Sequence, residues 1–436
     1  MTNALRLGIA GLGTVGTGLL NIVAKHSAAL TVRGGTPIEV SEVTARDRGK
    51  DRGIDLTGYT WAASPEVMAS SENVDVFVEL MGGDGEPAKS SVEAALRSGK
   101  HVVTANKALL AMHGNELAKL AEDNNVALNF EAAVAGGIPI VKTIRESATA
   151  NQISRVYGIM NGTCNFIMTK MRNEARDFAE VLAEAQELGY AEADPTFDIG
   201  GFDAAHKLAI LTSLAFGREI DFSAIYVEGI EHIQLRDITA ADNLGFKIKL
   251  LGVAVETEDG IEQRVHPTLV PKGSNIAEVE GVFNAVGLEG DSVGELILEG
   301  AGAGAGPTAS AVMADIIDIA RGNIVPPLGL PVDMLKPYKR ARMRAHEGGY
   351  YIALELFDRP GEVASVAQHM ANNNISLASI MQHTSDTAEK GTARETAPFI
   401  IITHDTLESD VRTALDEIEN GGHLASKPRV IRIERF

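Results

Sequence analysis

Four carboxylates and a lysine are gathered in one short segment, GYAEADPTFDIGGFDAAHKLAIL, which spans residues 189–211. Three of the acids lie in a stretch interrupted by proline and glycine, which predicts a loop. Asp203 opens a predicted apolar helix and Lys207 follows four residues later, so the two side chains share a helix face. Carboxylates in a partly closed site can hold an ammonium group, and a lysine beside a reacting oxygen can exchange a proton with it. The spacing alone is equally compatible with a surface salt bridge.

A second candidate site is the pattern GxGxxG in LGIAGLGTVGTGLL, formed by Gly11, Gly13 and Gly16. It follows a predicted strand and opens a predicted helix, the context in which this pattern binds a dinucleotide. The glycines allow a tight turn and let the backbone approach a pyrophosphate at the helix N-terminus. The alternative is a glycine-rich turn without a ligand, and the strand and helix favour the cofactor.

The end of the second predicted strand bears on which dinucleotide is bound. NAD-binding proteins usually place an acid there, whereas TARDRGKDRG brings Arg46, Arg48 and Lys50 together. These cations are placed to meet a 2′-phosphate, which predicts NADP, while Asp47 keeps NAD open. A solvated turn of mixed charge is the other interpretation.

The segments that must position these residues form three regions. Residues 1–130 alternate apolar runs with helical patterns, which predicts a Rossmann-type, doubly wound parallel sheet. The loops ELMGGDG and TANK follow its third and fourth strands. Because such sheets bind ligands at the carboxyl ends of their strands, Gly82, Thr104, Asn106 and Lys107 are expected to face the cofactor and the substrate.

The remainder of the chain predicts two further α/β units. Residues 131–322 predict an α+β domain with a mixed sheet, with strands in VYGIMNGTCNF, KIKLLGVAVET and EQRVHPTLV and helices at 164–188 and 203–216. Residues 323–346 hold four prolines and a basic run, which predicts a linker. Residues 347–436 follow the order strand, helix, strand, strand, helix, strand of a ferredoxin-like sandwich.

The composition limits the class of protein. Of the 436 residues, 45% are hydrophobic and 22% charged, as in ordinary globular proteins. The net charge of −20 argues against nucleic acid and anionic membranes as partners. One cysteine excludes an internal disulfide framework, and neither an export signal nor a long apolar run is visible, so a cytoplasmic protein is expected.

Along its whole length the chain resembles the homoserine dehydrogenase family. The resemblance is carried by GLGTVG, ELMGG, VTANKALL, FEAAVAGGIPI, NGTCNFI and LGYAEADPTFDIGGFDAAHKLAIL. It implies a Rossmann domain, a catalytic domain that also builds a dimer contact, and a homodimer or homotetramer. It also implies nicotinamide-dependent interconversion of homoserine and aspartate semialdehyde, in threonine, methionine and isoleucine biosynthesis.

The resemblance also assigns roles to residues. Lys207 is implied as the acid/base and Lys107 as a second active-site lysine. The implied substrate residues are Gly162, Thr163, Tyr190, Glu192, Asp198 and Asp203. The implied cofactor residues beyond those above are Thr14, Val15, Gly302 and Gly304, the last two in GAGAGP before a helix. A monovalent cation such as sodium is implied at Glu131, Val134, Gly136 and Ile138. One departure is Phe197, which stands where the family often has an acid.

The segment YYIALELFDRPGEVASVAQHMANNNISLAS resembles an ACT domain, a module that usually binds an amino acid where two copies meet. The resemblance implies threonine as the effector, with a domain that only dimerises as the alternative. The effector residues it implies are Asp358, Gly361, Glu362, Asn374 and Ile375.

Two rival functions remain open. Cys164, the single cysteine, could serve a different NADP-linked enzyme that oxidises an amino acid semialdehyde through a thiol, although a small buried residue is the favoured interpretation. A non-catalytic sensor could instead bind NADP and an amino acid through its end domains. The intact set of Glu192, Asp203 and Lys207 argues against the sensor.

Overall fold

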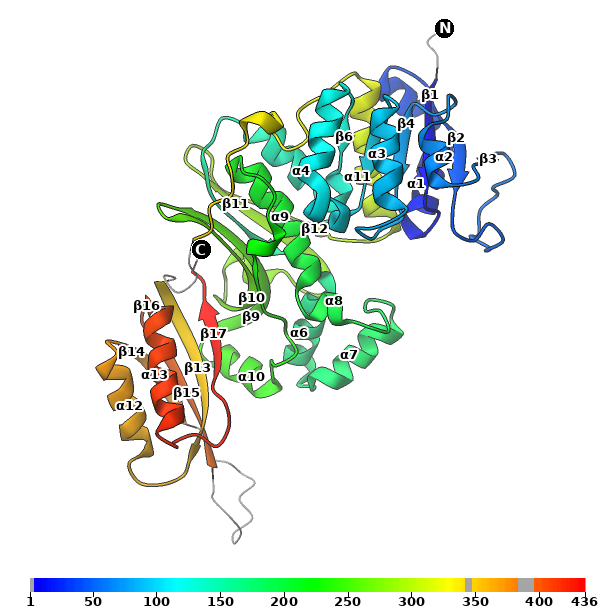
Figure 1. Ribbon diagram of the computed structural model, residues 1–436. Coiled ribbons are helices and arrows are strands. Elements are labelled where there is room, and N and C mark those ends of the chain that lie inside the picture. The colour runs from blue at the N-terminus through cyan, green and yellow to red at the C-terminus, as the bar shows by residue number, and fades with distance from the viewer. Residues whose placement is uncertain (1–3, 342–346, 383–395, 436) are drawn as a thin grey trace.

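The computed structural model describes residues 4–341, 347–382 and 396–435, so the last residues of the predicted linker, 342–346, lie outside the described part. The chain forms two sheets (Figure 1). A six-stranded sheet of N-terminal residues occupies one end of the molecule. An eleven-stranded sheet runs from the middle to the other end, where the C-terminal residues lie. No helix in the described ranges is long and apolar enough to cross a membrane.

The N-terminal sheet is parallel throughout and has the order β3-β2-β1-β4-β5-β6, which confirms the predicted doubly wound sheet. Its strands are β1 (Leu5–Ala10), β2 (Ile38–Thr44), β3 (Thr60–Trp61), β4 (Val76–Glu79), β5 (His101–Thr104) and β6 (Leu128–Asn129). The central strands are continuous apolar runs because helices cover both faces of the sheet.

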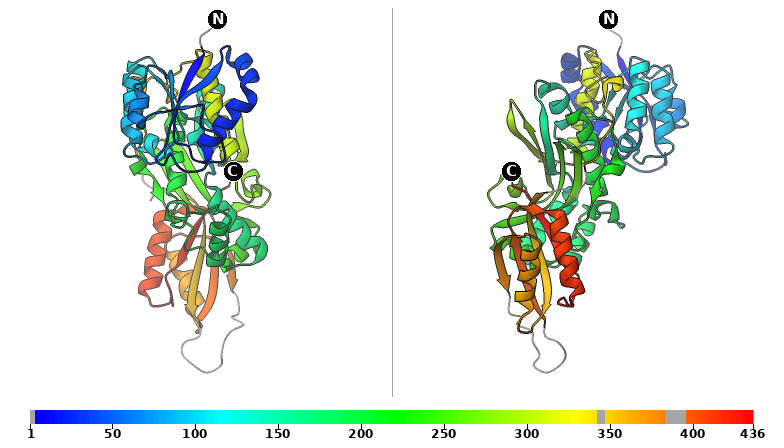
Figure 2. Two further views of the ribbon diagram at one scale, coloured as in Figure 1. Left: turned by 90° about the vertical axis from the view of Figure 1, so that its right-hand side faces the viewer. Right: turned by 60° about the vertical axis from the view of Figure 1, so that its left-hand side comes forward.

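The two faces are covered by different helices, as the left view of Figure 2 shows. One face carries α2 (Pro65–Ala69), α3 (Ala88–Arg97) and α4 (Lys107–Asp123). The other carries α1 (Thr14–Gly34) and α11 (Ala305–Ala320). A Cβ on Gly18 would lie 2.7 Å from the carbonyl oxygen of Ala305, so the two helices can approach only because residue 18 is glycine. Because α11 packs against α1, the loop that precedes α11 lies near the turn after β1.

The middle of the molecule holds the strand order β12-β11-β7-β9-β10. The strands are β7 (Ile153–Ile159), β9 (Phe246–Thr257), β10 (Gly260–Pro271), β11 (Phe283–Gly290) and β12 (Gly294–Ala301). The helices α6 (Gly162–Glu174) and α9 (Phe202–Phe216) pack against one face through a shared apolar core. The predicted helix at 203–216 is confirmed.

Two predicted boundaries in this region are wrong. The segment VYGIMNGTCNF is not one strand, because the chain leaves β7 at Ile159 and α6 begins at Gly162. The Asn161 side chain accepts a hydrogen bond from the Cys164 amide at 2.8 Å and so caps the helix. The predicted helix at 164–188 is two helices, α6 and α7 (Phe178–Glu187), separated at Ala175, which has a left-handed φ of 52°.

Short elements connect the larger ones. They are η1 (Glu131–Ala133), α5 (Ile140–Lys142), η2 (Thr143–Ser147), α8 (Thr196–Ile199), η3 (Phe222–Ala224), β8 (Tyr226–Val227), α10 (Leu235–Asn243), η4 (Asn275–Glu278) and η5 (Val332–Met334). The predicted linker follows α11 and makes two isolated bridges, from Lys336 to Arg218 and from Arg340 to Ile261. It therefore lies against the middle of the molecule.

The C-terminal residues form four long strands in the order β17-β13-β15-β14, the arrangement of a ferredoxin-like sandwich. The elements are β13 (Glu347–Phe357), α12 (Glu362–Asn372), β14 (Leu377–Gln382), β15 (Thr396–Thr403), β16 (Thr406–Leu407), α13 (Glu408–Asn420) and β17 (Arg429–Ile433). Both helices pack on one face. Strand β17 also pairs in parallel with β10, from Thr268 to Arg432 and from Leu269 to Ile433, so the middle and C-terminal strands form one sheet.

Candidate active site

The turn between β1 and α1 has the geometry that a dinucleotide requires. Gly11 has a φ of 104°, and a Cβ there would lie 2.4 Å from the Leu80 carbonyl oxygen. A Cβ on Gly16 would lie 2.1 Å from the Gly11 carbonyl oxygen. At Gly13, the N-cap of α1, no heavy atom of the described residues lies within 4 Å of an ideal Cβ. No described side chain caps the helix there. The first amides of α1, which begin at Thr14, therefore fit a pyrophosphate.

The basic residues after β2 surround the approach to this turn. Arg46, Arg48 and Lys50 are exposed, and the Arg48 guanidinium lies over the Trp61 ring at 5.2 Å. The sequence prediction did not single out Arg52, whose side chain donates to the Leu12 carbonyl oxygen at 3.0 Å. Arg52 also donates to the carbonyl oxygens of Lys50, at 2.7 Å, and of Asp47. The signal in the sequence that could have indicated Arg52 is its place as the fourth basic residue of TARDRGKDRG.

A cavity of about 640 Å³ lies between the N-terminal sheet and the middle of the molecule. The predicted residues that line it are Val15, Gly82, Lys107, Gly136, Gly162, Thr163, Tyr190, Glu192, Asp198, Asp203, Lys207, Gly302 and Gly304. Residues that the sequence prediction missed also line it, among them Asn161 and Asn284. The cavity therefore joins the candidate cofactor turn to the acid–lysine segment.

Thr104 is predicted to face the cofactor, but its side chain is buried and donates to Glu79 at 2.6 Å. It also accepts a hydrogen bond from the Asn106 amide at 2.9 Å. Thr104 thus supports the loop that begins α4, and it is the neighbouring Asn106 and Lys107 that line the cavity.

Asp203 lies at the centre of the charged groups in the cavity. Its carboxylate is 2.7 Å from the Lys207 ammonium and 3.2 Å from the Lys107 ammonium. Asn161 donates to the same carboxylate at 2.9 Å. Burial by itself would raise the pKa of Asp203, but the two ammonium groups and these hydrogen bonds hold that pKa well below its ordinary value. The predicted sharing of a helix face by Asp203 and Lys207 is confirmed, and the pair is buried.

The Lys207 ammonium is fixed from two directions. It donates to Asp203 and, at 2.7 Å, to the carbonyl oxygen of Met160 at the end of β7. An ammonium group carries a further donor beyond these two contacts. Because Lys207 lines the cavity, that donor can serve an oxygen of a bound molecule.

Asp198 is a second acid of the site and is partly buried. It accepts a hydrogen bond from Asn161 at 2.8 Å. Burial and the neighbouring charge of Asp203 raise the pKa of Asp198. Asn161 therefore bonds both acids while it caps α6, and the Asn-Gly pair before a helix was the signal for it.

The remaining predicted substrate residues form the rim of the cavity. Thr163 donates to the Tyr190 carbonyl oxygen at 2.6 Å, which ties the loop before α8 to α6. Glu192 lines the cavity and is exposed. Asp194 accepts hydrogen bonds from the amide and hydroxyl of Thr196, so its role is local.

Cys164 has the environment of a structural residue. It is fully buried, and its thiol lies 3.3 Å from the Asp198 carbonyl oxygen. Burial raises the pKa of the thiol well above its ordinary value, and the nearby carboxylates add to the effect. A reactive thiolate is therefore disfavoured.

The predicted cation ligands lie in one turn around η1. The Glu131 carboxylate accepts the amides of Val141 at 2.9 Å and Lys142 at 2.8 Å. Burial and the nearby charge of Asp315 raise the pKa of Glu131 to about 7. The described residues contain no group of three or more His, Cys, Asp or Glu side chains arranged for a metal. Besides Glu131, the predicted ligands Val134, Gly136 and Ile138 could offer only neutral backbone oxygens to the predicted monovalent cation.

The predicted effector residues lie at the two ends of α12. Gly361 has a φ of 98° and is the N-cap of the helix. Glu362 lies 2.6 Å from His423 and 3.2 Å from Arg359, and Asp358 precedes that arginine. Asn374, with a φ of 58°, and the buried Ile375 follow the helix.

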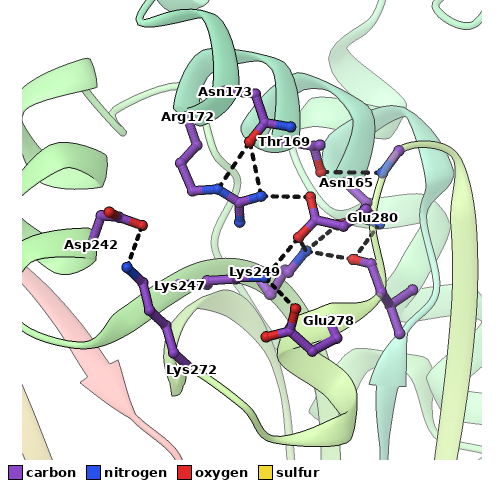
Figure 3. Close-up of polar contacts among 12 residues, drawn as sticks. Asn165, Thr169, Arg172, Asn173, Asp242, Lys247, Lys249, Lys272, Glu278 and Glu280 are labelled. Carbon is purple, nitrogen blue, oxygen red and sulfur yellow. Dashed lines mark hydrogen bonds and ion pairs between the residues drawn. The ribbon is translucent and has the colours of Figure 1, made fainter.

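A buried lysine that the sequence prediction missed, Lys249, lies at the centre of a group of polar contacts (Figure 3). Lys249 on β9 is 1% exposed and donates to Asn165 at 3.0 Å and to the Val279 carbonyl oxygen at 2.5 Å. Asn165 in turn donates to the Phe283 carbonyl oxygen at 3.1 Å. Lys249 thereby ties β9, α6 and the segment entering β11 together. The signal was the spacing of KIK, which places Lys247 and Lys249 on one face of a strand.

The glycine turn, the parallel sheet and the cavity define an NAD(P)-binding oxidoreductase. Two family models match the chain: "Homoserine dehydrogenase, NAD binding domain" over residues 11–131 and "Homoserine dehydrogenase" over residues 139–317. Homoserine dehydrogenase of Neisseria gonorrhoeae is 44% identical over 437 residues, covering 99% of this chain and 98% of that protein. That of Pseudomonas aeruginosa is 44% identical over 438 residues, covering 99% of each.

Solved structures of homoserine dehydrogenases are also similar to this chain. A homoserine dehydrogenase from Thiobacillus denitrificans superposes with a TM-score of 0.93 at 43% identity, covering 99% of each chain. A hyperthermophilic archaeal homoserine dehydrogenase in complex with NADPH has a TM-score of 0.62 at 29% identity, covering 72% of this chain and 97% of that one. This chain belongs to the homoserine dehydrogenase family and is an oxidoreductase with an NAD(P)-binding domain.

Proposed function

We propose that the protein interconverts homoserine and aspartate 4-semialdehyde in this cavity, with a nicotinamide cofactor bound at the turn after β1. The observation that carries the proposal is the Asp203 carboxylate held between Lys207 and Lys107, in a cavity that Val15 also lines. The cofactor, when bound, supplies or accepts the hydride. The remaining chemistry is the transfer of one proton at the substrate oxygen and the binding of the charged ends of the substrate.

Lys207 is the proposed acid/base, because its ammonium is buried, fixed by Asp203 and Met160, and lines the cavity. It donates a proton to the aldehyde oxygen during reduction and takes it from the hydroxyl during oxidation. Asp203 positions Lys207. Lys107 is proposed to meet the substrate carboxylate or the cofactor.

Glu192 and Asp203 are proposed to bind the substrate ammonium group. Glu192 lines the cavity and is accessible, and Asp198 supports it from within. Gly162, Thr163 and Tyr190 shape the loop against which the substrate lies.

The test is the rate of homoserine oxidation, measured as reduced nicotinamide, for wild type, Lys207→Ala and Lys107→Ala. Loss of a positioned acid/base is expected to lower kcat by about 10²–10⁴-fold in Lys207→Ala. Lys107→Ala is expected to raise KM more than it lowers kcat. Near-normal kcat in Lys207→Ala beside a collapsed kcat in Lys107→Ala would reverse the two roles.

We propose NADP as the preferred cofactor, with NAD as the alternative, because Arg46, Arg48 and Lys50 lie after β2. Arg48 stacks on Trp61, which restricts the guanidinium to the neighbourhood of the expected 2′-phosphate. The ratio of kcat/KM for NADP and NAD measures the preference, and equal values in wild type would refute it.

The thiol mechanism is disfavoured by the buried, hydrogen-bonded state of Cys164. Cys164→Ala is therefore expected to retain the rate of homoserine oxidation within a few-fold. Its complete loss in a folded variant would restore the semialdehyde-oxidising alternative.

We further propose the division into a nucleotide domain (1–130), a catalytic and dimerisation domain (131–322, which returns α11 to the first), a linker (323–346) and an ACT regulatory domain (347–436). The ferredoxin-like strand order supports the last of these. Threonine is the proposed effector, at Asp358, Gly361, Glu362, Asn374 and Ile375, in a homodimer or homotetramer. Calorimetry with threonine tests it, and absence of both binding and inhibition would remove threonine as the effector.

A monovalent cation such as sodium is proposed in the turn that contains Glu131, Val134, Gly136 and Ile138. The Gly136 position touches both the turn and the cavity, since a Cβ there would lie 2.4 Å from the Gly302 carbonyl oxygen. Melting temperatures in sodium and in a bulky organic cation test it, and equal values would argue against the site.

A further inference from the structure

Asn284, the second residue of β11, is a buried polar side chain with no role in the proposed reaction. Asn284 is 1% exposed and lines the cavity. Within residues 4–341, 347–382 and 396–435, neither its Oδ1 nor its Nδ2 atom has a hydrogen-bond partner. Buried amide groups are nearly always hydrogen-bonded, so a side chain of this kind that faces a cavity indicates a ligand.

The position of Asn284 joins the two sides of the site. A Cβ on Gly302, in the loop before α11, would lie 2.2 Å from the Asn284 Cγ atom. A Cβ on Gly162, at the start of α6, would lie 3.4 Å from its Oδ1 atom. The carboxamide therefore lies between the loop that borders the cofactor turn and the helix that carries Thr163, and its position requires a glycine at residue 302.

The backbone around Asn284 is held firmly. Asn284 is paired with Gly300 of β12, and the preceding residue, Phe283, accepts a hydrogen bond from Asn165. Asn165 is in turn fixed by Lys249 (Figure 3). The carboxamide is thus presented from a rigid strand.

The two free atoms specify the kind of group that would pair with them. Nδ2 donates and Oδ1 accepts, so the complementary group must carry an acceptor and a donor side by side. The ammonium of an amino acid substrate only donates, its carboxylate only accepts, and its hydroxyl has a single oxygen for both. A primary carboxamide has both, and the nicotinamide ring of the cofactor carries one.

We propose that Asn284 is a cofactor-binding residue that pairs its carboxamide with the carboxamide of the nicotinamide ring and so sets the orientation of the ring. The proposal rests on the proposed function only in requiring a nicotinamide cofactor in this cavity. Asn284→Leu keeps the approximate size of the side chain and removes both hydrogen-bonding atoms. Asn284→Asp keeps the shape and removes the donor.

The test is calorimetric binding of NADP and of its 3-acetylpyridine analogue, which lacks the amide N–H, to the full chain without substrate. Wild type is expected to bind NADP about tenfold more tightly than the analogue, the size of one lost hydrogen bond. In Asn284→Leu the affinity for NADP is expected to fall about tenfold, and the preference to disappear. Asn284→Asp keeps the oxygen that accepts the nicotinamide N–H and lacks the donor to the carbonyl oxygen, so it is expected to keep the preference and to bind both cofactors about tenfold more weakly. This keeps the test open if the leucine variant does not fold.

The matched control is Gln263→Leu, since Gln263 is another buried carboxamide, on β10, that does not line the cavity. It is expected to change stability and to keep the wild-type preference for NADP. Retention of that preference in Asn284→Leu, or unchanged affinity for both cofactors in Asn284→Asp, would overturn the proposal. So would unchanged cofactor affinity with a raised KM for homoserine, because Asn284 would then bind the substrate. Homoserine oxidation by wild type is measured separately, and its absence would refute the proposed function while the binding comparison still decides the role of Asn284.

Discussion

At the scale of single residues, Asp203 controls the charge of the cavity. It is buried and lies against two ammonium groups, Lys207 at 2.7 Å and Lys107 at 3.2 Å. Removing one partner of a buried ion pair leaves the other charge uncompensated. The carboxylate is therefore needed for both the position and the charge of Lys207.

Asp203→Asn is expected to lower the free energy of unfolding by roughly 3 kcal/mol and to reduce kcat by more than about tenfold. Urea denaturation and homoserine oxidation measure the two effects. Asp194→Asn is the control, in the loop that precedes α8, because Asp194 is exposed and its contacts to Thr196 are local. An Asp203→Asn variant as stable and active as the control would contradict the role of this carboxylate.

Lys249 is another residue whose charged group is buried. Burial lowers the pKa of Lys249 from 10.5 to about 8, against the opposing charge of Glu280. Arg172 and Lys247 lower it further, and Glu278 raises it. Because the unfolded chain binds the proton more tightly than the folded one, the free energy of unfolding should rise as pH increases from about 8 to 10.5.

Relative to Lys249→Met, wild type is therefore expected to gain on the order of 3 kcal/mol between pH 8 and pH 10.5. Urea denaturation of both proteins across this range measures the difference. Lys272→Met is the control, because Lys272 is partly exposed and pairs with Asp242 at 2.8 Å. If the difference in unfolding free energy between wild type and Lys249→Met does not change with pH, Lys249 has its ordinary pKa in the folded protein.

At the scale of elements, the contact between α1 and α11 determines where the loop at 302–304 lies. The contact is close because Gly18 has no side chain beneath the Ala305 carbonyl oxygen. Both Val15 on α1 and Gly302 before α11 line the cavity. A change in the helix contact should therefore reach cofactor binding.

Gly18→Ala is expected to destabilise the protein by about 1–3 kcal/mol and to weaken NADP binding, since the added methyl group would lie 2.7 Å from a backbone oxygen. Thermal melting and calorimetry measure the two effects. Gly306→Ala is the matched helical control, because no described heavy atom lies within 4 Å of the new methyl group, and it should be neutral or stabilising. Equal behaviour of the two variants would contradict the close packing of α1 and α11.

At the scale of the whole molecule, the C-terminal strands are structurally continuous with the middle of the chain. Strand β17 extends the sheet from β10, and Arg429 on β17 donates twice, at 3.0 Å, to Asp237 of α10. Tyr351 of β13 donates to the same carboxylate at 3.1 Å. Because of this continuity, a structural change in the C-terminal strands would act directly on the strands that support the cavity.

Arg429→Ala is expected to lower the free energy of unfolding by roughly 3 kcal/mol, because it leaves the buried Asp237 charge without its main partner. It should also expose the C-terminal residues to proteolysis before the N-terminal ones unfold. Arg435→Ala is the control, since Arg435 forms an exposed pair with Asp405 at 3.7 Å and should change stability by less than about 1 kcal/mol. Unchanged stability in Arg429→Ala would show that the two parts are not coupled through Asp237.

Local signals in the chain were enough to predict several parts of this structure. Strand–helix alternation predicted the parallel sheet, and GxGxxG marked the turn after β1, because both depend on neighbouring residues. The four-residue spacing of Asp203 and Lys207 predicted their shared face for the same reason. The prediction of a strand through NGTCNF was wrong because β7 ends at Ile159 and Asn161 caps a helix that begins at Gly162.

The sequence by itself determined which residues could carry charge, bind a phosphate or open a helix, since these properties belong to side chains and short segments. Only the tertiary structure decided which of them meet. It brought Lys107 of α4 to Asp203, placed α11 against α1, joined β17 to β10 and left the Asn284 carboxamide facing the cavity. Each of these contacts spans tens to hundreds of residues of chain, and each follows from the burial of apolar faces that no local pattern can assign to a partner.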